Sequence, residues 1–188
     1  MSWHRTALIV AIAALTVACS QQHAASSPSS AASTSPPSNS AGGSGSRCLT
    51  AQLQISIGPT NGATGNEITS VMLTNRSTAA CYLGGYPGVA LLDRNGRDLQ
   101  DARRSTNSFF GNYPPAQRVD IPPGGSASFD LTWGGNDPCG DVPAQHPTTM
   151  KITPPNDDDS ATITLNPPPT VCPNTLEVHP LGSRPQQG

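Results

Sequence analysis

Hydrophobic residues recur at every second position in several short segments of this chain, and this period of two is the feature that most restricts its fold. In residues 49–57 the odd positions are apolar and the even positions are polar, and residues 127–133 and 161–165 show the same alternation. Successive side chains of a β-strand point to opposite faces, so such segments are typical of strands with one buried face. No window has the period of an ordinary helix. The chain is therefore predicted to be all-β.

Turn-forming residues separate the alternating segments. Shorter strands are expected over residues 71–74, 89–93, 150–153 and 176–179. Between them stand turn signals such as Pro122-Pro123-Gly124-Gly125 and the triple proline of residues 167–169. About seven short strands in about 134 residues predict an immunoglobulin-like antiparallel β-sandwich, with a closed barrel as the alternative.

The first 19 residues have the layout of a bacterial lipoprotein signal sequence. Arg5 supplies the positive start, an apolar segment follows, and Thr16-Val17-Ala18 precedes Cys19. We expect cleavage before Cys19 and acylation of that residue, including palmitate, which places the protein on the extracytoplasmic face of the cell membrane. The charge-free segment is too short for a membrane span, which needs about 20 apolar residues. Plain secretion with an incidental cysteine is the alternative.

Five cysteines fit an exported protein. Acylation of Cys19 accounts for the odd thiol and leaves Cys48, Cys81, Cys139 and Cys172 for two disulfides. Four cysteines permit three pairings. Pairing within each half of the domain, Cys48 with Cys81 and Cys139 with Cys172, is favoured because it needs no long crossover, and each bridge is worth about 3 to 4 kcal/mol. No cysteine has the spacing of a zinc site, so no metal is expected.

Changes in composition predict four parts of the chain. Residues 1–18 are the signal peptide, and residues 19–47 are the lipidated cysteine with a disordered Ser/Ala/Pro/Gly tether. Residues 48–181 form the sandwich domain, and residues 182–188 a flexible tail. The tether is rich enough in Ser, Thr and Pro for O-glycosylation, although a bare spacer is the favoured interpretation.

Charge and motifs exclude some classes of function. The formal net charge is −2, which provides no basic field for nucleic acid. In the domain only His146 and His179 are candidates for general acid–base chemistry, and no serine lies in a nucleophile motif. Solvated histidines are the favoured interpretation. We therefore expect a monomer without catalytic residues or cofactor.

The order of motifs resembles a known family. The segments Leu73-Thr74-Asn75-Arg76-Ser77, Cys81-Tyr82-Leu83-Gly84-Gly85-Tyr86-Pro87-Gly88 and Pro123-Gly124-Gly125-Ser126-Ala127 occur in order with Trp133 and the four domain cysteines. This arrangement is similar to exported actinobacterial lipoproteins, mycobacterial ones among them, that carry a domain of unknown function with a Cys-x-Leu-x-Gly-Tyr-Pro-Gly motif. The resemblance implies a sandwich with two disulfides and implies no activity.

The glycine-rich end of that motif, residues 84–88, predicts a strand corner. Pro87 restricts Tyr86 to an extended backbone, and the glycines permit positive φ. We expect Tyr86 to place its ring in the core and its hydroxyl on a backbone carbonyl, as tyrosine corners do. A ligand-binding glycine loop is the alternative.

One irregular segment has the composition of a recognition surface. Residues 103–115 contain Arg103, Arg104, Phe109, Phe110 and Tyr113. Aromatic and Arg side chains are enriched at binding hot spots, so these five residues are the candidate partner-binding surface. The alternative is that Phe109 and Phe110 close one end of the core.

Together these observations predict a membrane-anchored envelope lipoprotein that acts as a non-catalytic binding module for an envelope protein or glycan. Two alternatives stay open. One is an envelope hydrolase with an unrecognised site, and the other is a structural or antigenic surface protein without a dedicated ligand.

Overall fold

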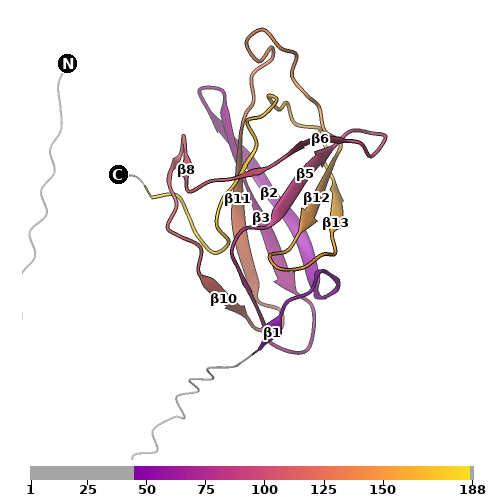
Figure 1. The fold of residues 1–188 in the computed structure, drawn as a ribbon, viewed down its shortest axis with the longest axis vertical. Helices are drawn as coiled ribbons and strands as arrows, with labels where there is room; N and C mark the ends of the chain where they lie inside the picture. The colour runs from indigo at the N-terminus through magenta and orange to yellow at the C-terminus, as the bar shows by residue number, and fades with distance from the viewer. Residues whose placement is uncertain (1–44, 187–188) are drawn as a thin grey trace, which may run out of the picture. The chain divides into compact units, whose positions relative to one another are not determined.

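The computed structural model describes residues 45–186. The predicted signal peptide, Cys19 and most of the tether lie outside the described residues. Among residues 45–186 the single helical element is the 3-10 turn η1 (Thr50–Gln52), so no described helix has the length or hydropathy to cross a membrane. The rest of the regular structure is β-strand (Figure 1).

Two sheets form the main layers of a sandwich. The first, here the long sheet, has the order β2-β3-β11-β14-β7. Its strands are β2 (Leu53–Ala63), β3 (Asn66–Asn75), β11 (Ser126–Gly134), β14 (Glu177–Val178) and β7 (Arg103–Arg104). The second, here the short sheet, has the order β13-β12-β5-β6. Its strands are β13 (Ala161–Thr164), β12 (Thr149–Thr153), β5 (Gly88–Leu92) and β6 (Asp98–Asp101).

Two small sheets complete the domain. One has the order β1-β4-β10 and contains β1 (Ser46–Arg47), β4 (Cys81–Gly84) and β10 (Arg118–Ile121). The other is a hairpin of β8 (Asn107–Ser108) and β9 (Gly111–Asn112). Between β4 and β5 the chain turns through Gly85, whose φ of 107° favours glycine. The predicted strand corner is therefore present.

The core lies between the sheets, and β11 shows how alternation builds it. Ala127, Phe129, Leu131 and Trp133 are buried, as the pattern predicts. The short sheet contributes four further buried side chains: Val89, Leu91, Met150 and Ile152. Burial of each large apolar side chain contributes about 1.5 to 3 kcal/mol. The all-β sandwich predicted from the period of two is confirmed.

Both disulfides have the favoured pairing. Cys48 is bonded to Cys81 and Cys139 to Cys172, each across a sequence separation of 33 residues. The first bridge ties the chain beside β1 to β4. The second joins two segments that β12 and β13 separate in sequence. Each bridge shortens the unfolded chain within one half of the domain.

The strand pattern differs from the prediction in three respects. Fourteen strand segments replace the predicted number of about seven, since several pairs involve only two residues. The pairs β1–β4 and β7–β14 are parallel, so the sandwich is not wholly antiparallel. The first long strand begins at Leu53 and continues through Pro59, because a bulge between Ile57 and Thr60 absorbs the expected break.

The predicted flexible tail is wrong for residues 182–186. The amide of Gly182 donates to the Ser128 carbonyl at 2.7 Å, and Asn112 and Gln186 exchange two backbone hydrogen bonds. Ser183 is buried. The composition of a short polar segment does not reveal backbone hydrogen bonds to distant residues. These bonds attach residues 182–186, here the C-terminal segment, to β11 and β9.

Candidate functional site

The two phenylalanines of the candidate surface form the tip of the β8–β9 hairpin, here called the aromatic hairpin (residues 107–112). Phe109 is 61 % exposed, and its ring meets the half-buried ring of Phe110 edge to face at 5.5 Å between centroids. Neither ring belongs to the core cluster. The alternative that they close one end of the core is therefore wrong. The Ser108 hydroxyl donates to the Gly111 carbonyl and accepts from the Phe110 amide, and these two hydrogen bonds stabilise the turn.

The two arginines lie on β7, at the edge of the long sheet. Arg103 makes an ion pair of 2.7 Å with Glu177 on β14, and its side chain stays largely exposed. The guanidinium of Arg104 lies 5.9 Å from the centre of the Tyr86 ring, within cation–π range. Both side chains are oriented by neighbours yet face solvent. Tyr86 is half-buried and its ring packs against the core, as expected. Among residues 45–186 no carbonyl accepts a hydrogen bond from its hydroxyl, so the expected tyrosine-corner bond is not present.

Tyr113 is a correction to the candidate surface, because it is buried with 4 % of its surface exposed. Its ring stacks on the ring of His179 at 3.9 Å between centroids, and its hydroxyl donates to Asp130 Oδ2 at 3.2 Å. Burial, followed by the nearby charge of Asp130, raises the pKa of the Tyr113 hydroxyl. Tyr113 therefore holds the aromatic hairpin to the domain and is inaccessible to a partner.

His179 is also buried, so the expectation of a solvated histidine is wrong for this residue. Its Nδ1 lies 2.9 Å from the Ser105 carbonyl oxygen and its Nε2 lies 2.9 Å from the Thr132 hydroxyl. A carbonyl only accepts, so Nδ1 carries the proton and Nε2 accepts from Thr132. Burial lowers the pKa of His179. A neutral, fully hydrogen-bonded imidazole follows, and it faces no open site.

Asp130 connects these groups to the C-terminal segment. Its carboxylate accepts hydrogen bonds from Ser70, Tyr113 and Arg184, and the carboxylate side chain is 2 % exposed. Arg184 also donates to the Ser70 hydroxyl at 2.9 Å. We call Ser70, Tyr113, Asp130, Thr132 and His179 the polar cluster. It lies on the outer face of the long sheet, where the aromatic hairpin and C-terminal segment cover it.

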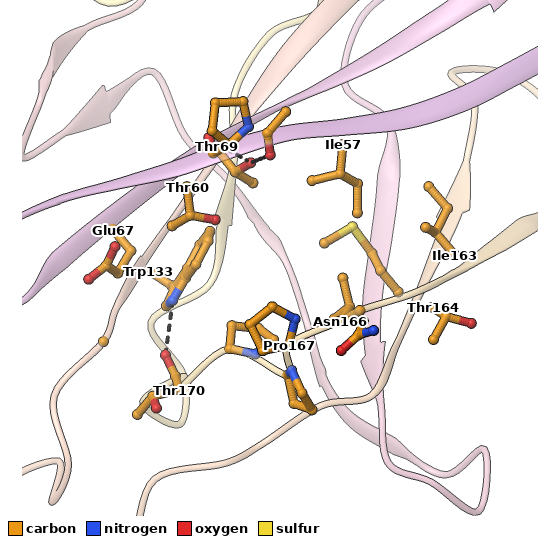
Figure 2. Close-up of a pocket in the computed structure, with 17 residues that line it drawn as sticks. Ile57, Thr60, Glu67, Thr69, Trp133, Ile163, Thr164, Asn166, Pro167 and Thr170 are labelled. Carbon is orange, nitrogen blue, oxygen red and sulfur yellow. Dashed lines mark hydrogen bonds between the residues drawn. The ribbon is translucent and has the colours of Figure 1, made fainter.

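A groove opens between the edge strands of the two main sheets, β2 and β13 (Figure 2). Its volume is about 700 Å³. The apolar side chains that line it are Ile57, Trp133, Met150, Ile163 and Leu165. The polar side chains are Thr60, Glu67, Thr69, Thr164, Asn166 and Thr170. No lysine or arginine is among the described residues of the lining, so Glu67 carries the only charge there.

The two ends of the groove differ in polarity. Figure 2 shows Glu67 and Thr60 beside Trp133 at one end, and Ile57 and Ile163 at the other. Trp133 is 6 % exposed, and its Nε1 donates to the Thr170 carbonyl at 3.0 Å. The indole therefore forms an apolar wall and has no free donor. Sequence reasoning placed Trp133 in the core and did not identify the groove.

The Glu67 side chain is positioned by two glycines. In the long sheet Glu67 lies opposite Gly62 on β2 and Trp133 on β11, so its side chain shares the inner face with Trp133. A Cβ at Gly62 would lie 2.7 Å from both carboxylate oxygens, and one at Gly135 would lie 2.6 Å from Glu67 Cγ. Because both neighbours are glycines, the Glu67 side chain occupies space that a side chain at either position would fill. Within residues 45–186 no hydrogen bond or ion pair involves its carboxylate.

The other titratable residues considered as site candidates do not gather in one place. His146 is exposed on the loop before β12 and is not part of the polar cluster. In the described part of the chain no three His, Cys, Asp or Glu side chains gather in a metal-binding arrangement. Three consecutive aspartates occupy residues 157–159, and the first of them, Asp157, accepts hydrogen bonds from the amide and hydroxyl of Thr50. Those bonds lower the pKa of its carboxyl.

Comparison with known proteins identifies a family. The family model described as "Domain of unknown function (DUF4232)" matches residues 48–182, which is most of the described domain. A search of curated proteins finds no match to the chain. The family description names no activity, so the chemistry of the aromatic hairpin and of the groove carries the functional argument.

Proposed function

The chain belongs to the DUF4232 family, a domain of unknown function, and we propose that this member is a membrane-anchored binding module of the cell envelope. The proposal has two parts. The first is lipid attachment at Cys19, and the second is non-catalytic binding of an envelope protein by the aromatic hairpin together with Arg103 and Arg104.

Anchoring is supported by the order of charge, apolar segment and cysteine in residues 1–19. Two disulfides in the domain fit an oxidising compartment. Incorporation of labelled palmitate into the wild type and its loss in Cys19→Ala would support this part. Equal labelling of the two proteins would refute it.

The exposure of Phe109 is the observation that carries the binding part. A phenylalanine at a hairpin tip gains no folding energy from water-exposed ring surface, whereas aromatic rings buried at an interface contribute strongly to binding. Two oriented guanidinium groups on β7, the strand that precedes the hairpin in the sequence, add planar hydrogen-bond donors. This combination favours a protein partner, because protein interfaces are enriched in aromatic residues and arginine.

Hydrolysis is the less favoured function. A general base must lie within hydrogen-bond reach of a substrate, and His179 is buried with both ring nitrogens engaged. That leaves the exposed His146 as the histidine on which an esterase or peptidase site would depend. Loss of a measured hydrolytic activity in His146→Ala would favour the hydrolase over the binding module.

Crosslinking in living cells tests the binding part. A photoreactive amino acid at position 109 should capture a discrete envelope protein, and the same group at Val142, which is 48 % exposed on another loop, should not. In purified form Phe109→Ala should weaken binding of the captured protein by about tenfold or more and change the free energy of unfolding by less than about 0.5 kcal/mol. Substantial destabilisation with unaltered binding would refute the proposal.

A further inference from the structure

The groove is bordered by strand edges that have no partner in the described chain. β2 pairs only with β3, and β13 pairs only with β12. β2 presents an edge over eleven residues, from Leu53 to Ala63. Unpaired amide and carbonyl groups along such an edge are a template for another extended chain.

The two edges are not equally suited to pairing. β13 contains four residues and is soon followed by Pro167, Pro168 and Pro169, which have no amide hydrogen to donate. β2 is longer and contains a single proline, Pro59, at its bulge. β2 is therefore the better edge for an added strand, whose side chains would alternate toward the groove and toward solvent.

The lining favours a peptide over a carbohydrate. Sugars commonly stack on exposed aromatic faces, but the one aromatic side chain among the described lining residues is Trp133, which is 6 % exposed and engaged through Nε1. The apolar end, formed around Ile57 and Ile163, instead offers space for an aliphatic side chain. Burial of one such side chain contributes about 1.5 to 3 kcal/mol.

Charge sets the second requirement on the ligand. Glu67 is half-buried at the polar end of the groove, and no cation among residues 45–186 pairs with it. A carboxylate held in place by its surroundings and partly shielded from water binds a lysine ammonium or an arginine guanidinium through charge-assisted hydrogen bonds. Residues 20–46 of the tether contain no lysine or arginine, and Arg47 is held on β1, so the tether does not supply the ligand.

We propose that the groove binds an extended peptide segment of a partner protein, which adds to the edge of β2, fills the apolar end with an aliphatic side chain and pairs a Lys or Arg with Glu67. This site lies at the β2 edge of the long sheet. The aromatic hairpin adjoins its β7 and β14 edge, so the two surfaces act separately.

Short fluorescent peptides test the proposal by polarisation with the purified domain. In each peptide threonine alternates with valine or leucine, and one position carries Lys, Arg, Gln or Glu. The Lys and Arg peptides should bind at least about tenfold more tightly than the Gln peptide, and the Glu peptide should bind least. Methylation of alternate backbone amides in the Lys peptide should abolish binding, because the methylated strand cannot pair with β2.

Two variants assign the selectivity to Glu67. Glu67→Gln should bring the Lys and Gln peptides to within about twofold of each other. Glu177→Gln changes the other glutamate of the chain, which pairs with Arg103 on β7, and should leave the preference intact. Phe109→Ala should also leave it intact, so failure of the hairpin proposal and failure of this one are distinguishable.

Several outcomes would overturn the proposal. Absence of binding by the Lys and Arg peptides at about 1 mM would do so. So would a preference for Lys that persists in Glu67→Gln, or tight binding of the methylated peptide. Sedimentation that shows dimerisation lost in Ile163→Ser would assign the groove to a second copy of this chain instead.

Discussion

Two carboxylates of the long sheet have opposite environments, although they lie on neighbouring strands. Asp130 points to the outer face, yet it is buried, because the aromatic hairpin and residues 182–186 cover that face. Glu67 shares the inner face with Trp133, yet it is half-exposed and has no partner in the described residues. Figure 1 shows the β2–β3 hairpin extending past the end of β13, so the short sheet does not cover this part of the inner face.

The difference separates a structural carboxylate from a candidate binding carboxylate. A buried charge is retained when hydrogen bonds compensate for its lost hydration, and Asp130 accepts three. A partly exposed charge needs no such compensation for folding and can pair with a ligand. Mutation of the two residues should therefore affect different properties of the protein.

The largest expected effect is that of Asp130→Ala on stability. Removal of the carboxylate leaves the buried hydroxyl of Tyr113 without its acceptor and releases Ser70 and Arg184. We expect a loss of about 3 kcal/mol in the free energy of unfolding, measured by urea denaturation. Asp120→Ala is the control, because Asp120 is exposed and its ion pair with Arg118 should be worth less than about 1 kcal/mol. Equal effects of the two changes would show that Asp130 is not a structural centre.

Acidification should weaken the polar cluster through His179. Burial lowers the pKa of this imidazole in the folded state, so the unfolded state, with an ordinary pKa of about 6.5, binds more protons below that pH. The free energy of unfolding should be level above about pH 6.5 and fall below it, by at most about 1.4 kcal/mol per pH unit for one proton. Urea denaturation between about pH 7.5 and pH 5 measures this slope.

Two controls assign the pH dependence. His179→Gln should flatten the slope, and His146→Gln on the exposed loop should keep it. Hydrogen bonds also lower the pKa of the Asp93 and Asp157 carboxyls, so protonation of those groups reduces stability only below about pH 4. A titration of the His179 ring by NMR with an ordinary or raised pKa would contradict the prediction.

Much of the sandwich could be predicted from the sequence because the evidence for it is local. Alternation over residues 127–133 identified the buried side chains of β11, and the cysteine spacing favoured the observed disulfides. At the N-terminal end the same reasoning was less accurate. Leu49 continues the alternation but is 52 % exposed, since the 3-10 turn η1 precedes the strand.

The polar cluster and the groove could not be predicted because each depends on segments distant in sequence. Tyr113 was assigned to a surface from composition, but its position depends on Asp130 and His179, and no periodic pattern connects these three residues. Glu67 lies in a strand whose alternation gives no sign that the facing sheet ends before it. The presence of a glutamate in the same cross-strand row as Trp133 becomes visible only with the register of β3 and β11.

A smaller effect is expected for Tyr113→Phe, which keeps the ring and removes only the hydroxyl. The stack on His179 should persist, and Asp130 should lose one of its three donors. We expect a loss of about 1 kcal/mol in the free energy of unfolding. In a double-mutant cycle with Asp130→Ala the two effects should be less than additive, because both variants lack the same hydrogen bond. Additive effects would place the Tyr113 hydroxyl outside the cluster in solution.

The smallest expected effect on stability is that of Glu67→Gln, and it tests the comparison most directly. Glutamine keeps the size of the side chain between Gly62 and Gly135 and removes the charge. Because no cation in the described domain pairs with Glu67, the free energy of unfolding should change by less than about 0.5 kcal/mol. Urea denaturation of this variant beside Asp130→Asn, the same chemical change at the other carboxylate, provides the measurement. A loss above about 1 kcal/mol for Glu67→Gln would show that Glu67 contributes to folding, as Asp130 does, and that the groove has no carboxylate free for a ligand.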